Sequence, residues 1–393
     1  MILTNEQEKA LKIILEKYKN HEKYVTICGF AGVGKSTLVK FAIEALDVDQ
    51  DRVTYACYTG KAAEVLRRKG NKNAMTLHRL LYDSIPRPGG GFFRKPKMSL
   101  EYDIVVVDEI SLAPKSMIDM LLKHKVFCIF IGDSFQLPQI DKTEAHDYLE
   151  HPDIFLSTIM RQAEESEIIR LTMKIRNREE IDFYEGKEVI IAPKASLVTG
   201  HYTWADQIIC ATNATRVAVN NQVRNLLGYH GNPQDGERMI CLRNYWDDIS
   251  ESGEGALVNG STGIIRNPFE TYIEAPYYVK MKNHRMPSIC GVFYSDDGEV
   301  YNNVDMDKNM IEKGEPFLDW RESYALGKLK MKIGDIVPRQ FSYGYAITCH
   351  KSQGSEFEKV LVLEESFPFV KLEHARWLYT ACTRASEKLV LLR

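Results

Sequence analysis

The sequence predicts an α/β protein whose strands form parallel sheets. Its apolar runs are continuous rather than alternating, as expected for strands that helices cover on both faces. Helical patterns at 61–69 and 115–123 lie between some of these runs, which is typical of strand–helix–strand units. The apolar runs are 24–28, 53–58, 104–107, 126–131 and 207–211.

A change in composition marks a second type of structure inside the chain. From about Gly228 to Arg339 the sequence is rich in Tyr, Asn and Gly, with short alternating runs and turn signals such as Asp297-Gly298. The α/β pattern then resumes with apolar runs at 359–363 and 388–392. With 393 residues and 44% hydrophobic content, we expect several domains with real cores. The expected domains are 1–157, 158–227 together with 339–393, and a β-rich insertion at 228–338.

Charge and cysteine content limit the possible function classes. The 51 basic and 54 acidic residues give a net charge of −3, so any contact with nucleic acid must be local. The eight cysteines lie far apart and form no C-x-x-C pair, which favours reduced core residues in the cytoplasm. No signal region and no apolar stretch of ~20 residues is evident, so we expect no membrane insertion.

The segment Gly29–Thr37 has the spacing G-x-x-x-x-G-K-S between an apolar run and a helical pattern. Glycines at such positions let backbone N–H groups approach phosphates, and the positive end of the new helix faces them. Lys35 would reach the β- and γ-phosphates, and the Ser36 hydroxyl would ligate Mg²⁺. The complete Lys-Ser ending disfavours an ordinary glycine-rich turn. The sequence therefore predicts a site for ATP and Mg²⁺, whose residues are Gly32, Gly34, Lys35, Ser36 and Thr37.

Two further strand ends carry polar side chains at the expected ligand-binding edge. Asp108 and Glu109 follow the run 104–107, where an open parallel sheet presents its carboxyl edge. Asp108 would help to hold Mg²⁺, and Glu109 would orient or activate the attacking water. Gln136 follows the next run, at 126–131, and is a candidate sensor of the γ-phosphate or its water. A polar turn that merely ends the strand is the alternative for this last segment.

Phosphoryl transfer also needs positive charge against the developing charge on the γ-phosphate. The candidates outside the first domain are Arg161 and Arg384. Taken singly, each is more often a solvated surface arginine.

In this order the motifs resemble a superfamily 1 helicase of the RecD/Dda/Pif1 type, the subgroup that moves 5′ to 3′ on single strands. The Gly132–Pro138 segment resembles its third motif, and Tyr345–Glu356 its fifth. The resemblance implies that Arg161 and Arg384, in the fourth and sixth motifs, are arginine fingers. It also implies that Gln7 reads the adenine base. Ser36 in place of a threonine and Gln139 in place of a second proline are departures that remove no required group.

The resemblance implies a fold of two RecA-like P-loop domains, with a short hairpin insertion in the first and a small SH3-like β-rich insertion in the second. The hairpin, at 82–100, occupies the position of a pin that splits the duplex, and Phe92 or Phe93 would stack on the last base pair. A flexible glycine-rich loop with tucked aromatics is an equally open alternative. The residues implied to contact the strand are Thr59, Lys61, Thr76, His78, Thr348, His350 and Ser352.

The function implied is that of an ATP-dependent 5′-to-3′ DNA helicase, a hydrolase acting on single-stranded DNA and on junctions with duplex. We expect a monomer in a bacterial or phage-infected cytoplasm, with single-stranded-DNA-binding or replication proteins as further candidate partners. Two alternatives remain open. One is a translocase that does not unwind, or that acts on RNA. The other is an ATP-gated clamp, against which the intact Glu109 argues because binding alone does not require it.

Overall fold

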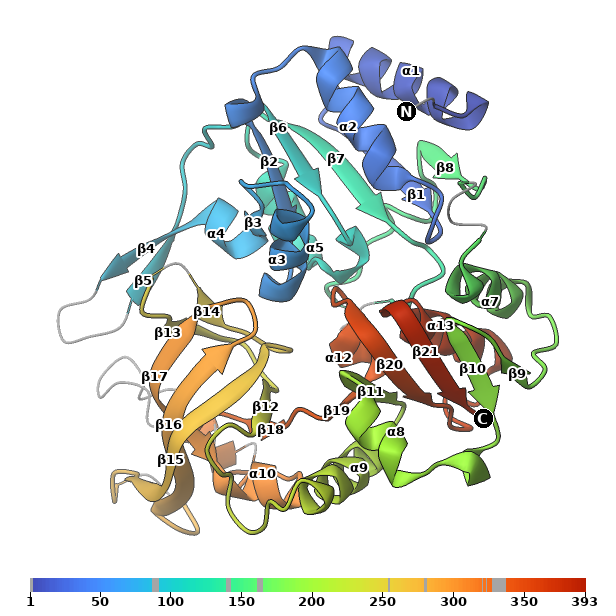
Figure 1. Cartoon of the computed structure of the whole chain (residues 1–393). Coiled ribbons are helices and arrows are strands. Elements are labelled where there is room, and N and C mark those ends of the chain that lie inside the picture. The colour runs from blue at the N-terminus through green and yellow to red at the C-terminus, as the bar shows by residue number, and fades with distance from the viewer. Residues whose placement is uncertain are drawn as a thin grey trace. The chain divides into compact units, whose positions relative to one another are not determined.

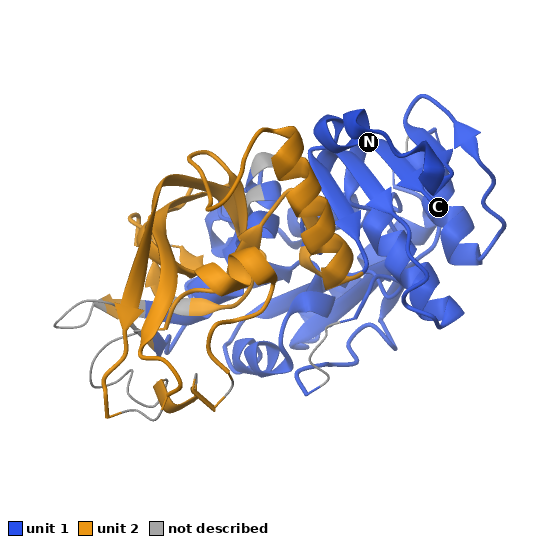
Figure 2. Cartoon of the chain, turned by 90° about the horizontal axis from the view of Figure 1, so that it is seen from below, with its two compact units in different colours: residues 1–83, 95–211, 352–393 blue, residues 84–94, 212–351 orange. Residues whose placement is uncertain are grey.

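The computed structural model describes residues 3–86, 92–138, 143–160, 165–253, 255–278, 281–319, 321–322, 324–326 and 337–393. The chain divides into two compact units, shown in Figure 2. Unit 1 comprises residues 1–83, 95–211 and 352–393, and unit 2 comprises residues 84–94 and 212–351. Each unit is therefore built from segments that are far apart in the sequence.

The first sheet of unit 1 is parallel, with the strand order β3-β2-β6-β7-β1-β8 (Figure 1). Its strands are β1 (Tyr24–Gly29), β2 (Val53–Cys57), β3 (Met75–Thr76), β6 (Ile104–Val107), β7 (Phe127–Gly132) and β8 (Ile154–Leu156). The associated helices are α1 (Asn5–Lys19), α2 (Lys35–Leu46), α3 (Gly60–Arg68), α4 (Leu77–Leu81) and α5 (Lys115–Leu121). The predicted strands 24–28, 53–58, 104–107 and 126–131 are confirmed.

Strand β6 is apolar at every position because its two faces pack into two different core clusters. Ile104 and Val106 belong to one core cluster, together with residues of α1 and α2. Val105 and Val107 belong to another, together with residues of α4 and α5. Because successive side chains of a strand point to opposite faces, a sheet covered on both faces requires apolar residues throughout.

A second sheet of unit 1 contains the neighbouring strands β11-β20-β21-β10-β9. These are β9 (Tyr184–Glu185), β10 (Val189–Ala192), β11 (Gln207–Cys210), β20 (Phe357–Leu363) and β21 (Ala385–Leu392). They are parallel except for β9, which pairs antiparallel with β10. Its helices are α7 (Glu167–Asn177), α8 (Thr199–Trp204) and α13 (Lys371–Cys382). The apolar runs at 207–211, 359–363 and 388–392 are thus strands, as predicted.

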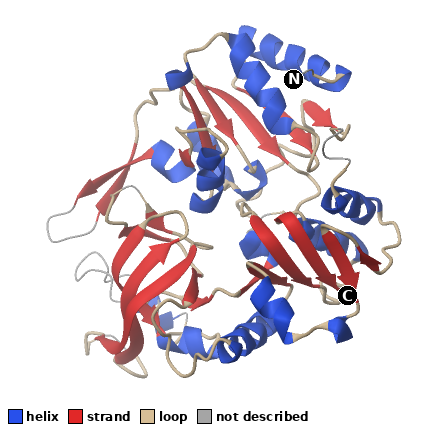
Figure 3. Cartoon of the chain, in the orientation of Figure 1, coloured by secondary structure: helices blue, strands red, loops and turns tan. Residues whose placement is uncertain are grey.

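Unit 2 contains an antiparallel five-stranded sheet with the order β17-β16-β15-β12-β18. Its strands are β12 (Arg238–Cys241), β15 (Thr262–Glu274), β16 (Arg285–Ser295), β17 (Val300–Asp307) and β18 (Phe341–Tyr343). The strands are labelled in Figure 1 and drawn in red in Figure 3. The other elements of this part of the chain are β13 (Tyr245–Ile249), β14 (Ala256–Leu257), α9 (Asn213–Leu226), α10 (Lys308–Lys313), β19 (Ala346–Thr348) and α12 (Cys349–Ser352), whose last residue belongs to unit 1. The sheet therefore includes a strand beyond residue 338, and the domain limits and the SH3-like assignment stay predictions.

The segment 82–100 contains two strands that pair with each other, β4 (Tyr82–Pro86) and β5 (Phe92–Pro96). Residues 87–91 between them lie outside the described part of the chain, as do the side chains of Phe92 and Phe93. The pin hypothesis therefore stays a prediction.

A buried ion pair anchors α9 to the start of the antiparallel sheet in unit 2. The Arg224 guanidinium donates to both carboxylate oxygens of Glu237, over 2.7 and 2.9 Å. Glu237→Ala would leave a buried guanidinium uncompensated, so we expect a loss of about 3–5 kcal/mol in the free energy of unfolding, measured by urea denaturation. Lys282, whose ion pair with Asp319 is exposed, is the control, and Lys282→Ala should cost at most about 1 kcal/mol. Equal effects of the two changes would contradict the assigned role of the buried pair.

Among the described residues no helix is long and apolar enough to cross a membrane. All eight cysteines are buried and unbridged.

Candidate nucleotide site

The loop between β1 and α2 has the geometry of an anion-binding turn. Gly32 and Gly34 both have φ of 79°, a left-handed conformation that glycine adopts without steric cost. Within the described residues no side chain caps the amino terminus of α2, which leaves its first N–H groups for phosphate oxygens. Ser36 is exposed in the first turn, and Thr37 follows it. The Lys35 ammonium donates to the loop carbonyls of Gly29 and Phe30, over 2.7 and 2.9 Å.

Gln7 supports this loop from α1. Its side-chain oxygen accepts from the Thr4 N–H in a capping box, and its Nε2 lies 3.4 Å from the carbonyl oxygens of Val33 and Gly34. A Cβ on Gly34 would lie 2.6 Å from the same Nε2, which adds a second reason for glycine there. Both ends of the Gln7 amide are hydrogen-bonded within the protein. To contact an adenine base, Gln7 would have to break one of these hydrogen bonds and form a new one to the base.

Asp108 and Glu109 lie directly after β6, at the carboxyl edge of the first sheet. Burial, together with the neighbouring charge of Glu109, raises the pKa of Asp108 to about 6, while the Glu109 N–H bond and Lys35 oppose the shift. The N–H of Glu109 donates to Asp108 Oδ1 over 2.9 Å. Glu109 itself has φ of 50°, an uncommon conformation for a residue other than glycine. The edge therefore holds two carboxylates that a cation would stabilise.

Gln136 lies close to this carboxylate pair, as the sequence predicts. Its Nε2 donates to Glu109 Oε1 over 3.4 Å. In the part of the chain that the structure describes, Glu109 Oε2 and Gln136 Oε1 are buried without a hydrogen-bond partner. Because buried polar atoms are rarely left unsatisfied, these two oxygens mark a place where a water or a ligand group fits.

The residues present fit a magnesium–nucleotide complex. Magnesium at such sites takes one or two carboxylates and completes its shell with phosphate oxygens and waters. Asp108 and the exposed Ser36 hydroxyl are the groups that would hold it. No cluster of three or more His, Cys, Asp or Glu suited to a metal occurs among the described residues, so a site made by protein side chains alone is absent there.

Helix α13 brings a residue that the sequence reasoning missed. The Tyr379 hydroxyl accepts from the Ala31 N–H in the phosphate loop, over 3.1 Å, and donates to Asp133 Oδ2, over 2.6 Å. The neighbouring Thr380 Oγ1 accepts from the Leu137 N–H over 2.9 Å. Tyr379 lies in the segment 378–384 that ends at Arg384 of the sixth motif, but only the contacts in the folded protein show which way its side chain points.

Of the two predicted arginine fingers, the structure describes only Arg384. Arg161 lies outside the described residues. Arg384 is 5% exposed and turns inward, where its guanidinium donates to the carbonyls of Thr380 and Ser355 and to the Thr383 hydroxyl. Contact with a γ-phosphate would require Arg384 to exchange some of these bonds, so its role as a finger stays a prediction.

The predicted strand-contacting residues of the first sheet lie at helix starts. Thr59 and Thr76 are the amino-terminal caps of α3 and α4, where their hydroxyls accept from the N–H groups of Ala62 and Arg79. The Lys61 ammonium lies 4.0 Å from the centre of the Phe357 ring. His78 is half-buried, and its ring stacks with the Tyr82 ring, with the two ring centroids 6.1 Å apart.

The fifth-motif residues are more enclosed. Thr348 ends β19 and is half-buried, as is His350. Burial, and secondarily the charge of Lys351, lower the pKa of His350, which favours its neutral form. Ser352 has no exposed surface, so the prediction that it contacts a strand directly would require this segment to open.

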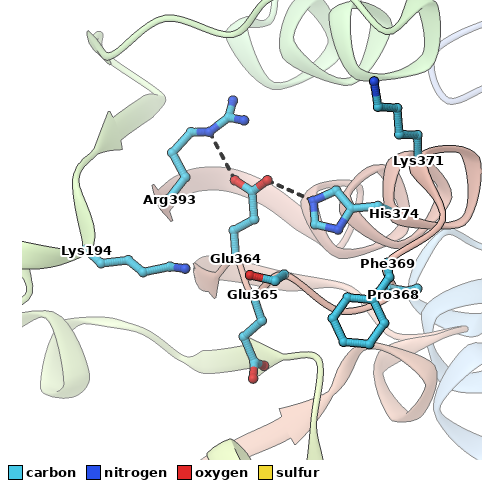
Figure 4. Close-up of a pocket in the computed structure, with 9 residues that line it drawn as sticks. Lys194, Glu364, Glu365, Pro368, Phe369, Lys371, His374 and Arg393 are labelled. Atoms are coloured by element: carbon cyan, nitrogen blue, oxygen red, sulfur yellow. Dashed lines mark hydrogen bonds and ion pairs between the residues drawn. The ribbon is translucent and has the colours of Figure 1, made fainter.

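A separate cavity of about 410 Å³ lies beyond the carboxyl ends of β20 and β21 (Figure 4). Glu364 is paired there with His374 at 2.9 Å and with Arg393 at 3.1 Å, and Glu365 accepts from the Ala211 N–H. Because its carboxylates are already paired and no residue of the nucleotide site lines it, we assign this cavity no part in nucleotide binding. Its lining residues are Lys194, Glu364, Glu365, Ser366, Pro368, Phe369, Lys371, His374 and Arg393.

Comparison with known proteins agrees with the site. The family described as an AAA domain matches residues 2–193, and a UvrD-like helicase C-terminal domain matches residues 343–392. The ATP-dependent RecD2 DNA helicase of Deinococcus radiodurans is 27% identical in an alignment that covers 95% of this chain and 47% of the relative. The ATP-dependent DNA helicase dda of Enterobacteria phage T4 is 28% identical over 44% of this chain and 43% of the relative. Each alignment thus covers less than half the length of the relative.

Among solved structures, the Pif1 helicase from Bacteroides in complex with ADP-AlF3 and ssDNA covers the whole chain, with 92% of its own length matched, a TM-score of 0.51 and 19% identity. At this identity the likeness shows a shared fold.

The phosphate loop after β1 and the carboxylate pair after β6, on one parallel sheet, define a P-loop nucleoside triphosphatase. The matched domains and relatives point further, to the superfamily 1 helicases of the RecD/Dda/Pif1 type, and the two relatives named above are ATP-dependent DNA helicases.

Proposed function

We propose that the chain moves 5′ to 3′ on single-stranded DNA and unwinds duplex at junctions, driven by hydrolysis of ATP. The observation that carries this proposal is the contact of α13 with the phosphate loop and with the segment after β7. It comprises the bonds from Tyr379 to Ala31 and Asp133 and from Thr380 to Leu137. A motor needs nucleotide state to be communicated between folded parts, and we propose that these bonds carry it from the phosphate loop to α13.

In the proposed reaction the protein supplies positioning and charge rather than covalent chemistry. Lys35 would leave the carbonyls of Gly29 and Phe30 to bind the β- and γ-phosphates. Glu109 and Gln136 would hold the attacking water with the two oxygens that lack partners among the described residues. Bound magnesium would neutralise phosphate charge, with Asp108 and Ser36 as its protein ligands. Arg161 and Arg384 are the proposed fingers on the γ-phosphate.

Contact with the DNA strand is proposed for residues at helix starts. Thr59 and Thr76 accept from backbone N–H groups, and their hydroxyl hydrogens remain able to donate to phosphate oxygens. Lys61, His78, Thr348 and His350 are further proposed contacts. In support, Pif1 from Bacteroides has been solved bound to ssDNA, and another Pif1 structure concerns unwinding at forked dsDNA.

Strand separation assays on duplexes with a single-stranded tail test the direction. With ATP and Mg²⁺, we expect rapid unwinding of the duplex with a 5′ tail and none of the duplex with a 3′ tail, because a 5′-to-3′ motor loaded on the tail meets the junction only in the first. Loss of unwinding without ATP and in the Lys35→Ala protein is the control. Unwinding of the 3′-tailed duplex alone would refute the direction.

If neither duplex opens while single strands still stimulate ATP hydrolysis, the alternative of a translocase or an ATP-gated clamp replaces unwinding. The same assay with an RNA tail distinguishes a preference for RNA. The eight buried thiols support a reducing cytoplasm as the compartment. We also propose that the protein acts as a monomer, which light scattering in the presence of the tailed DNA tests.

A further inference from the structure

Tyr379 connects two predicted ATPase segments of the first sheet to α13. Its side chain is 1% exposed, and its ring packs edge-on against Phe135 with centroids 5.2 Å apart. Its hydroxyl accepts from the Ala31 N–H and donates to Asp133 Oδ2. Both hydrogen-bonding capacities of the phenol are thus used, one on the phosphate loop and one on the segment that also carries Gln136.

The surroundings make this hydroxyl a strong anchor. Asp133 is buried, and its other oxygen accepts from the Phe135 N–H over 2.9 Å. Burial raises the pKa of Tyr379, and the Asp133 charge adds to the shift, so the phenol remains a donor at neutral pH. A hydrogen bond from a neutral donor to a buried charged acceptor is stronger than one between neutral groups.

The same turn of α13 leads to Arg384. Thr380 Oγ1 accepts from the Leu137 N–H, and the carbonyl of Thr380 accepts from Arg384 Nε over 3.1 Å. The Gln353 amide also donates to the Leu137 carbonyl, over 2.6 Å. The position of this turn relative to the phosphate loop therefore helps to set the position of the Arg384 guanidinium.

We infer that Tyr379 is a positioning residue for ATP hydrolysis. Its hydrogen bonds to the phosphate loop and to Asp133 hold in place the turn of α13 that leads to Arg384. The inference rests on the proposed hydrolysis at this site and goes beyond it, because Tyr379 touches neither the nucleotide nor the attacking water in this role. It acts through Ala31 and Asp133. Its contribution therefore belongs to the hydrolytic step and to stimulation by DNA rather than to nucleotide affinity.

Tyr379→Phe tests the inference because it keeps the ring against Phe135 and removes only the hydroxyl. We expect kcat for ATP at saturating single-stranded DNA to fall about tenfold or more, as expected when a buried carboxylate and a buried N–H lose their partner. The Kd of a fluorescent ATP analogue should change less than about twofold, and stimulation by DNA should fall with kcat. Tyr343→Phe is the matched control. Tyr343 is a buried tyrosine of unit 2, and its hydroxyl has no partner among the described residues.

Asp133→Ala, which removes the acceptor oxygens, and the double variant with Tyr379→Phe complete the test. If the two side chains act through their shared hydrogen bond, the double variant should lose no more activity than the more affected single variant. Additive losses, an unchanged kcat in Tyr379→Phe, or a weaker Kd with normal kcat would each overturn the inference. If Tyr379→Phe fails to fold, the decision falls to Asp133→Ala, which removes the acceptor of the Tyr379 hydroxyl, and a normal kcat in this variant overturns the inference. ATP hydrolysis by the unaltered protein, stimulated by DNA, shows separately that the hydrolysis on which the inference rests takes place, and the tailed-duplex assay tests the proposed unwinding independently.

Discussion

Replacing Lys35 with alanine should reduce the rate of ATP hydrolysis by about 100- to 1,000-fold or more, which would abolish turnover in a standard assay. The Lys35 ammonium is held at the mouth of the phosphate loop by the carbonyls of Gly29 and Phe30. Its charge also opposes the raised pKa values of Asp108 and Asp133. No other lysine is placed in this loop, so its removal eliminates the positive charge that the phosphates would meet there.

The measurement is steady-state ATP hydrolysis with and without single-stranded DNA. Lys40→Ala is the matched control, because Lys40 is an exposed lysine one turn further along α2. Lys40→Ala should hydrolyse ATP at the rate of the unaltered protein. Normal turnover by Lys35→Ala would remove the phosphate loop from the reaction and refute the assigned site.

The second large effect is expected for Glu109→Gln, which should slow hydrolysis about 10²- to 10⁴-fold while ATP still binds. Glutamine has nearly the same shape as glutamate, so the left-handed backbone at this position and the packing should be preserved. The substitution removes the charge that would orient or activate water at Glu109 Oε2. Because the ATP complex persists, affinity for single-stranded DNA in the presence of ATP should be retained.

Single-turnover hydrolysis and ATP binding, measured on the same sample, separate the two effects. Glu44→Gln is the control, because Glu44 is an exposed glutamate of α2. Loss of ATP binding in parallel with hydrolysis would indicate a structural role for Glu109, and an unimpaired hydrolytic rate would exclude it as the water-orienting group.

Much of the site could be predicted because its parts are local in the sequence. A run such as 104–107 is apolar at every position only if both faces of the sheet are covered, and the two core clusters confirm this. The residues directly after such a strand must then lie at its carboxyl edge. Asp108, Glu109 and Gln136 follow two neighbouring strands of the sheet, β6 and β7, which is why they lie close together.

Other features required contacts across hundreds of residues. Ala31 and Tyr379 are 348 positions apart, and Leu137 and Thr380 are 243 apart. The periodicity of the sequence cannot predict which way a tyrosine points when most of its helix is buried. The inward direction of Arg384 and the complete burial of Ser352 are likewise consequences of packing, and neither follows from their motifs.

The sequence by itself therefore determined the parallel α/β architecture, the phosphate loop and the carboxylates at the edge of its sheet. It could do so because glycine conformation, strand periodicity and the polarity of strand ends depend on residues a few positions apart. Only the tertiary structure decided that Gln7 supports the loop, that Arg384 begins turned inward and that Tyr379 joins the loop to Asp133. These depend on which segments meet in the folded core, where a single hydroxyl or guanidinium takes whichever partners the packing brings within hydrogen-bond distance.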